Sequence, residues 1–187
     1  MKRVVVKPGF LLLLGILLFL DEGVGMLPAG LMAAVLHEGG HYLSGRLFDG
    51  RLRRLELSAV GAGMELEYPR PLSYLQEIVV TLAGPVVNLL LGWLGMAAGR
   101  FLFASVNLGL AALNLLPILP LDGGRVLWNA VTYAAGETWG ERTVTVVSAV
   151  LVGGLVGVGV VAALHFANIS LLIVSLWLLW VVLTRKK

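Results

Sequence analysis

The stretch of residues 36–42 reads LHEGGHY and holds three polar side chains at a spacing that suits catalysis at a metal ion. On a helix, His37 and His41 lie one turn apart on the same face, where their imidazoles can share one ion. Glu38 stands beside the first histidine and can accept a proton from a water molecule on that metal. Zinc lowers the pKa of such a water molecule to about 7. The pattern predicts one Zn2+ ion bound by His37 and His41, with Glu38 as the general base.

The motif lies deep within an apolar segment, about nine residues or roughly 14 Å of helix from its end. Ionisable groups at that depth in a membrane are rare and mark functional sites. The alternative is a polar network between helices that holds no metal. Gly39 and Gly40 are poor helix formers, and we expect them to let a neighbouring helix or an extended substrate approach closely.

Asp122 is the candidate for the third protein ligand that a catalytic zinc site needs. It stands in NLLPILPLDGGR at residues 114–125, where two prolines interrupt a helix near the cytoplasmic face. Broken backbone at membrane depth lines a cavity or is buried in protein. The alternative is that Asp122 caps the following helix, and the local sequence favours neither reading. His165 and Glu77 are expected at the ends of spans, away from the motif.

A further polar feature is Asn88, which lies in LAGPVVN at residues 82–88. Gly84 and Pro85 disturb the apolar segment just before it. Asn88 either bonds a neighbouring helix at a kink or lines the active-site pocket with its amide.

Composition places the chain in a membrane. Of the 187 residues, 58% are hydrophobic and only 13% are charged, and the mean hydropathy is +0.92. The net charge of +3 comes from residues that flank apolar runs, which indicates membrane topology and no nucleic-acid partner. The absence of cysteine excludes disulfides and thiolate metal sites.

The sequence predicts an all-α polytopic membrane protein with about six transmembrane helices. The apolar segments cover about 4–20, 24–46, 74–98, 101–119, 143–165 and 168–184. We expect the first segment to be a transmembrane helix and not a cleaved signal peptide. We expect the third and fourth segments to form a tight antiparallel hairpin that turns at Gly99 and Arg100. With both termini in the cytoplasm, every basic residue except Arg100 falls on the cytoplasmic side, as the positive-inside rule requires. This predicts a multi-pass membrane protein.

Two cytoplasmic segments are more than linkers. Residues 52–68 alternate apolar and polar side chains around GAG, which predicts a membrane-associated β-hairpin. This hairpin either only lies on the membrane or offers an edge strand to an extended peptide. Residues 123–142 hold aromatic side chains among polar ones and are expected to form a helix at the membrane surface.

Three of these motifs together resemble the site-2 proteases, the intramembrane zinc metalloproteases. They are HEGGH at residues 37–41, AGPVVN at residues 83–88 and NLLPILPLDGG at residues 114–124. The resemblance covers about residues 1–125 and is strongest to the branch of stage IV sporulation protein FB. Gly39 occupies a position that is bulky and apolar in many members. The chain ends at Lys187, and we expect neither the CBS domain of that branch nor a PDZ insertion.

The resemblance implies a role for each matching residue. His37, His41 and Asp122 correspond to the zinc ligands and Glu38 to the general base. Asn88 and Asn114 correspond to polar residues near the substrate. The implied domain is a single membrane metalloprotease domain over residues 1–187, with its core at about 24–125 and C-terminal spans at 143–184.

The predicted function is hydrolysis of a peptide bond in a membrane-embedded or membrane-tethered protein near the cytoplasmic face. The resemblance implies signalling roles such as processing of a pro-sigma or anti-sigma factor, and an inhibitory membrane partner. Two other functions remain open. A metal-ion transporter also carries intramembrane histidines and broken helices, and a pseudoprotease would bind tethered clients without cutting them.

Overall fold

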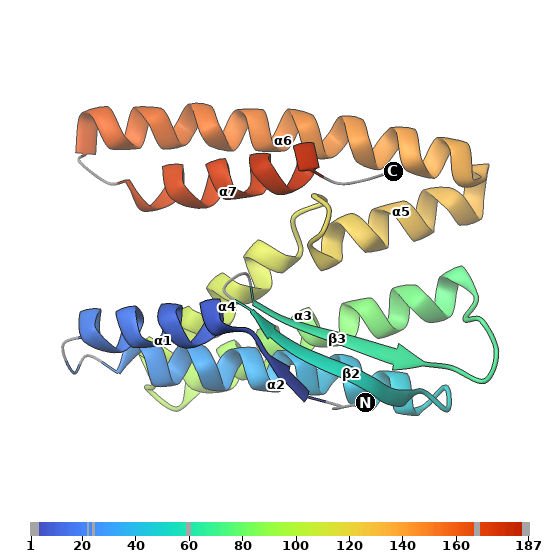
Figure 1. The fold of residues 1–187 in the computed structure, drawn as a ribbon, viewed down its shortest axis with the longest axis horizontal. Coiled ribbons are helices and arrows are strands. Elements are labelled where there is room, and N and C mark those ends of the chain that lie inside the picture. Colours follow the sequence, from blue (N-terminus) through green and yellow to red (C-terminus); the bar gives the residue numbers. More distant parts are fainter. Residues whose placement is uncertain (1–3, 22, 24, 59–60, 167–168, 185–187) are drawn as a thin grey trace. The chain divides into compact units, whose positions relative to one another are not determined.

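The computed structural model describes residues 4–21, 23, 25–58, 61–166 and 169–184 (Figure 1). These residues form seven helices and three short strands. The chain divides into two compact units, residues 1–114 and residues 115–187. The mostly helical architecture agrees with the predicted fold class, and the predicted hairpin is part of a three-stranded sheet.

The first unit begins with strand β1 (Val4–Val6), which leads directly into helix α1 (Pro8–Leu20). The sequence predicts a helix from about residue 4, and that start is wrong. β-branched valines favour an extended backbone, and the fixed φ of proline suits the first turn of a helix. β1 runs parallel to β2 (Arg51–Ser58), with Val5 opposite Glu56.

Lys7 fixes the first strand to the second. Its backbone N–H donates to the carbonyl of Leu57 over 2.8 Å, and its ammonium group forms an ion pair with Glu56. The hydrogen bond from Lys7, with the positive charges of Lys7 and Arg54, holds the pKa of Glu56 below its usual value. Lys7 is therefore bound to the outer edge of β2 through both its backbone and its side chain.

The predicted β-hairpin is present as β2 and the antiparallel strand β3 (Gly61–Glu67). GAG does not form its turn as the sequence suggests. Gly61 pairs with Ser58 and Gly63 with Glu56, so GAG belongs to the ladder, and the turn itself lies outside the described residues. The strand order is β1-β2-β3, which leaves β3 as an outer strand among the described residues.

Helices α2 (Met26–Arg46), α3 (Tyr74–Ala97) and α4 (Phe101–Asn114) pack against one another in the first unit. The predicted tight hairpin between the third and fourth apolar segments is confirmed. Gly99 adopts a left-handed backbone with φ of 68°, and the N–H of Arg100 donates to the carbonyl of Gly95 over 2.8 Å.

The two glycines of HEGGH differ in their surroundings. A Cβ added at Gly40 would lie 2.7 Å from the carbonyl oxygen of Ala83 and 3.0 Å from a methyl group of Val87, both on α3. The expected close approach of a helix is therefore confirmed at Gly40. Nothing among the described residues lies within 4 Å of a Cβ at Gly39, so no helix approaches there.

A second pair of glycines, Gly45 and Gly50, forms a notch at the end of α2 that receives β3 and the residue after it. A Cβ at Gly45 would overlap the side chain of Leu66 and lie 2.9 Å from the hydroxyl of Tyr68. A Cβ at Gly50 would lie 2.7 Å from Cε1 of Tyr68. The hairpin is thus packed, without spare room, one turn beyond His41.

The second unit consists of α5 (Asp122–Ala135), α6 (Glu137–Phe166) and α7 (Ser170–Thr184). α5 packs on α6, and α6 and α7 lie side by side (Figure 1). The predicted surface helix at 123–142 ends earlier, because Gly136 takes a φ of 90° that ends α5. The polar residues after this glycine belong to the same helix as the predicted fifth span.

Among the described residues, two helices are long and apolar enough to cross a membrane. They are Tyr74–Ala97 and Glu137–His165. Two shorter apolar helices cover Phe101–Asn114 and Leu171–Thr184. The predicted count of six spans is not confirmed by this measure.

Candidate metal centre

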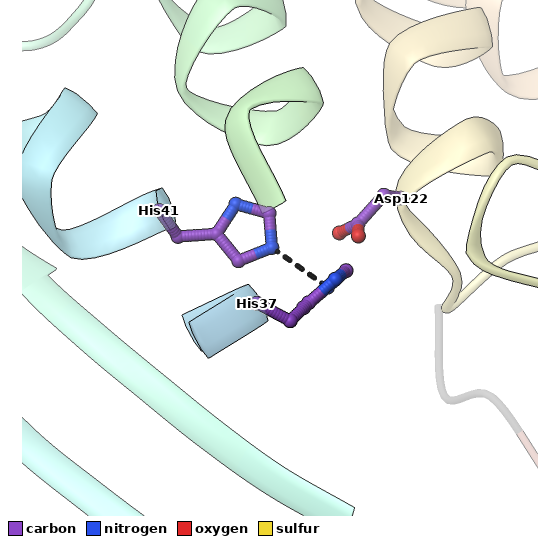
Figure 2. Close-up of side chains that lie close together, drawn as sticks. All are labelled: His37, His41 and Asp122. Carbon is purple, nitrogen blue, oxygen red and sulfur yellow. Dashed lines mark hydrogen bonds between the residues drawn. The ribbon is translucent and has the colours of Figure 1, made fainter. Parts of the chain in front are cut away.

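The two histidines of α2 turn their rings toward each other. The Nε2 atoms of His37 and His41 are 3.1 Å apart, and the rings meet edge to face with centroids separated by 4.7 Å (Figure 2). His37 is buried, with 6% of its surface exposed, and His41 is half-buried. The spacing of four residues therefore brings both Nε2 atoms to one point on the helix face, as the sequence predicts.

The other ring nitrogens fix the tautomers. Nδ1 of His41 lies 2.9 Å from the backbone carbonyl of Val80 on α3. A carbonyl can only accept, so this Nδ1 carries the proton. Nδ1 of His37 lies 2.5 Å from Oδ1 of Asn88, also on α3.

A chain of amides sets the direction of that second bond. Asn107 on α4 donates from Nδ2 to the carbonyl of Phe103 over 2.9 Å. Its Oδ1 therefore accepts from Nδ2 of Asn88 over 2.8 Å. Asn88 also donates to the carbonyl of Ala33 over 3.1 Å, and its Oδ1 is left to accept from His37. Asn88 and Asn107 are fully buried, so these bonds do not exchange with water.

With Nδ1 as the donor in each ring, Nε2 is the nitrogen of each imidazole that can bind a metal. The two Nε2 atoms lie within hydrogen-bond distance of each other, and a cation beside them could be bound by both. Two nitrogens at ~2.0–2.1 Å from a tetrahedral zinc ion lie about 3.4 Å apart, close to the observed 3.1 Å. Histidine ligands of zinc usually donate their second N–H to an oxygen, as both do here. The donor set therefore fits a zinc ion.

Gly84 on α3 borders the space beside the two nitrogens. A Cβ at this position would lie 2.6 Å from Cε1 of His41 and 2.8 Å from Nε2 of His37, and closer still to Nε2 of His41. Any residue other than glycine would therefore press on the atoms that face the metal position. The sequence marks Gly84 only as a disturbance of the third apolar segment.

Glu38 follows His37 on α2 and is half-buried. Because Glu38 is the next residue along the helix, its side chain is rotated by about 100° about the helix axis from that of His37. It thus stands beside the histidine face, as its expected role requires.

Asp122 is the first residue of α5 and is buried, with 7% of its surface exposed. The N-cap is Leu121 and makes no side-chain cap bond. The reading of Asp122 as the N-cap is therefore wrong. One potential ligand atom from each of His37, His41 and Asp122 lies within 4.8 Å of the others (Figure 2).

The remaining candidates lie elsewhere. Asn114 ends α4, where its Nδ2 donates to the carbonyl of Leu110 in the same helix over 3.1 Å. His165 is exposed in the last turn of α6, and Glu77 lies in the first turn of α3, both at helix ends as expected. Sequence reasoning missed Asn107 and the carbonyl of Val80, since no local pattern marks a residue that bonds a histidine on another helix.

Comparison with known proteins supports the same chemistry. The family model of the M50B-like peptidases matches residues 10–121, more than half of the chain, and that of peptidase family M50 matches residues 95–158. Stage IV sporulation protein FB of Bacillus subtilis is 35% identical over 112 residues, which cover 52% of this chain and 37% of that protein. The zinc metalloprotease MJ0392 of Methanocaldococcus jannaschii is 25% identical over 159 residues, which cover 78% of this chain and 44% of that protein.

A solved structure extends the likeness to the fold. The site-2 protease from Methanocaldococcus jannaschii matches all of this chain and 93% of the solved chain, with a TM-score of 0.70 and 20% identity. The chain spans less than half the length of the two curated relatives. With its histidine pair, its buried aspartate and these matches, the chain belongs to the M50B-like peptidases, within the site-2 protease family.

Proposed function

We propose that this protein is an intramembrane zinc metalloendopeptidase. It hydrolyses a peptide bond of a membrane-embedded or membrane-tethered protein near the cytoplasmic face. The observation that carries the proposal is the pair of Nε2 atoms of His37 and His41, which lie 3.1 Å apart in rings that are held by hydrogen bonds at both Nδ1 atoms. Membership of a peptidase family supports hydrolysis as the reaction.

The residues take the following roles. His37, His41 and Asp122 hold the zinc ion, which supplies Lewis-acid activation of water and of the scissile carbonyl when it is bound. Glu38 accepts a proton from the attacking water and delivers it to the leaving amine, so the peptide bond breaks as one C–O bond forms. Asn88 keeps His37 in the tautomer that binds metal. Asn114 is proposed to lie near the substrate.

In this proposal residues 1–187 act as one membrane domain with about six spans and both termini in the cytoplasm. The distribution of basic residues supports that topology. The short helices α1 and α4 would then cross only part of a bilayer, which neighbouring segments must complete. Processing of a sigma or anti-sigma factor and inhibition by a membrane partner are narrower proposals, supported by the likeness to stage IV sporulation protein FB.

The hairpin is proposed to hold the unwound substrate as an added strand on β3. β1 covers the outer edge of β2, so an extended peptide would add to β3. A peptide bond within a helix is shielded by its own turn, and an added strand would keep the substrate extended.

Proline substitutions at two neighbouring positions of β3 test this role. Successive N–H groups of a strand point to opposite edges. Of the two variants Gly63→Pro and Met64→Pro, one therefore loses a hydrogen bond to β2, and the other loses an N–H that faces the outer edge of β3. The variant that loses only the edge-facing donor should keep its thermal stability and lose roughly 2- to 10-fold in cleavage. The other serves as the matched control and should melt at a lower temperature. Wild-type cleavage by the thermally stable variant would exclude strand addition.

The function itself is tested by co-expression with candidate membrane-tethered proteins and assay of the purified enzyme in detergent. We expect a single cut in a substrate, loss of cleavage after zinc removal by a chelator, and recovery on addition of zinc. A protein that binds zinc and client but never cuts would be the pseudoprotease. Zinc flux in proteoliposomes without cleavage would support the transporter.

A further inference from the structure

The segment that delivers Asp122 has no regular secondary structure of its own. Residues 115–121 connect α4 to α5. The backbone hydrogen bonds within this segment join residues close in sequence, such as that from the N–H of Leu121 to the carbonyl of Ile118 over 2.8 Å. Asp122 follows directly as the first residue of α5. The position of its carboxylate therefore depends on what holds this segment.

One side of the segment rests on the glycines that follow Asp122. A Cβ at Gly124 would lie 2.5 Å from both the carbonyl carbon of Ile118 and the nitrogen of Leu119. A Cβ at Gly123 would lie 2.5 Å from the carbonyl oxygen of Leu116. The first turn of α5 and the peptide between Ile118 and Leu119 are thus in contact through backbone atoms alone.

The same peptide is held from α6 by a side chain. Oγ of Ser148 accepts a hydrogen bond from the N–H of Leu119 over 3.1 Å. Ser148 is 2% exposed and Ile118 is fully buried, so the acceptor of this part-buried bond lies inside the second unit. Without this acceptor the N–H of Leu119 would lose its protein partner, so the bond favours one position of the segment.

We propose that Ser148 is a positioning residue for the metal ligand Asp122. The Ile118–Leu119 peptide is held between Gly124 and Ser148, and this fixes where α5 begins and where the carboxylate of its first residue lies. The inference rests on the proposed role of Asp122 in zinc binding. It gives α6 a part in the metal centre that the apolar character of this helix does not suggest.

The test compares Ser148→Ala with Ser175→Ala. Ser175 is also fully buried in the second unit, but its hydroxyl donates to the carbonyl of Leu172 in its own helix over 3.0 Å. The two variants lose the same atom. Zinc affinity, measured by competition with a chelator, should fall about 10- to 100-fold in Ser148→Ala and stay unchanged in Ser175→Ala. The visible spectrum of the Co2+-substituted protein should change in the first variant only.

Wild-type zinc affinity and an unchanged Co2+ spectrum in Ser148→Ala would overturn the inference. If that variant does not fold, Ser148→Cys decides the question, because sulfur is a weaker acceptor of similar shape. A smaller decrease in affinity is then expected, and wild-type affinity overturns the inference. Asp122→Ala tests the ligand role of Asp122 separately from the positioning role of Ser148. Unchanged zinc affinity in this variant would contradict the proposed ligand set, whatever the result for Ser148.

Discussion

Glu38→Gln is expected to bind zinc as the wild type does and to lose cleavage by about 100- to 10,000-fold, the usual contribution of a general base. Glutamine keeps the size of the side chain but cannot take a proton from water at neutral pH. In the proposed site the histidines hold the metal through Nε2 atoms that this substitution does not touch. The measurement is the rate of substrate cleavage in detergent, together with zinc content by elemental analysis.

Glu77→Gln is the matched control. Glu77 lies in the first turn of α3 and undergoes the same loss of charge, so its cleavage rate should equal that of the wild type. Turnover near the wild-type rate by Glu38→Gln would remove Glu38 from its role as the base. Loss of zinc from the same variant would instead assign it to the metal ligands.

Gly84→Ala is expected to lower zinc affinity by about 100-fold or more. This loss exceeds the usual effect of changing a residue that only hydrogen-bonds a metal ligand. The added methyl group would lie 2.8 Å from Nε2 of His37 and nearer to Nε2 of His41. The rings are held from behind by Asn88 and Val80, so they cannot retreat without breaking those bonds. Competition with a chelator measures the affinity, and cleavage should fall in parallel.

Gly39→Ala provides the control on α2. Gly39 lies between the two histidines, but nothing among the described residues is within 4 Å of its added Cβ. Alanine favours a helix over glycine by up to about 1 kcal/mol, so this variant should bind zinc normally and melt at the same temperature or higher. Equal zinc affinity in Gly84→Ala and the wild type would contradict the role given to Gly84.

Much of the metal centre could be predicted because its chemistry is local in sequence. The spacing of His37 and His41 needs only a helix to bring both rings together. Gly123 and Gly124 lie in the first turn of α5, where they contact the segment before Asp122, and no local pattern indicates that contact. Gly84 was harder to predict, since its reason is a contact with a helix more than 40 residues earlier in the chain. The function of a glycine is set by what its missing side chain leaves free.

The fold differs from expectation where a partner segment decides the structure. Residues 4–6 are apolar enough to begin a helix, but β2 offers them a strand to pair with. The residues directly after Gly136 are polar, and the apolar run begins several residues later. The long helix α6 nevertheless begins at Glu137. Hydropathy reports where a membrane surface lies, whereas backbone angles decide where a helix ends.

The notch of Gly45 and Gly50 has a mechanical consequence. Leu66 and Tyr68 fill it without room for one methyl group, so the hairpin cannot slide over the end of α2. In such packing a small displacement is transmitted and not absorbed. A force that tilts the hairpin would therefore also turn the helix that carries His37 and His41. A displacement of the hairpin would therefore reach the two histidines through α2.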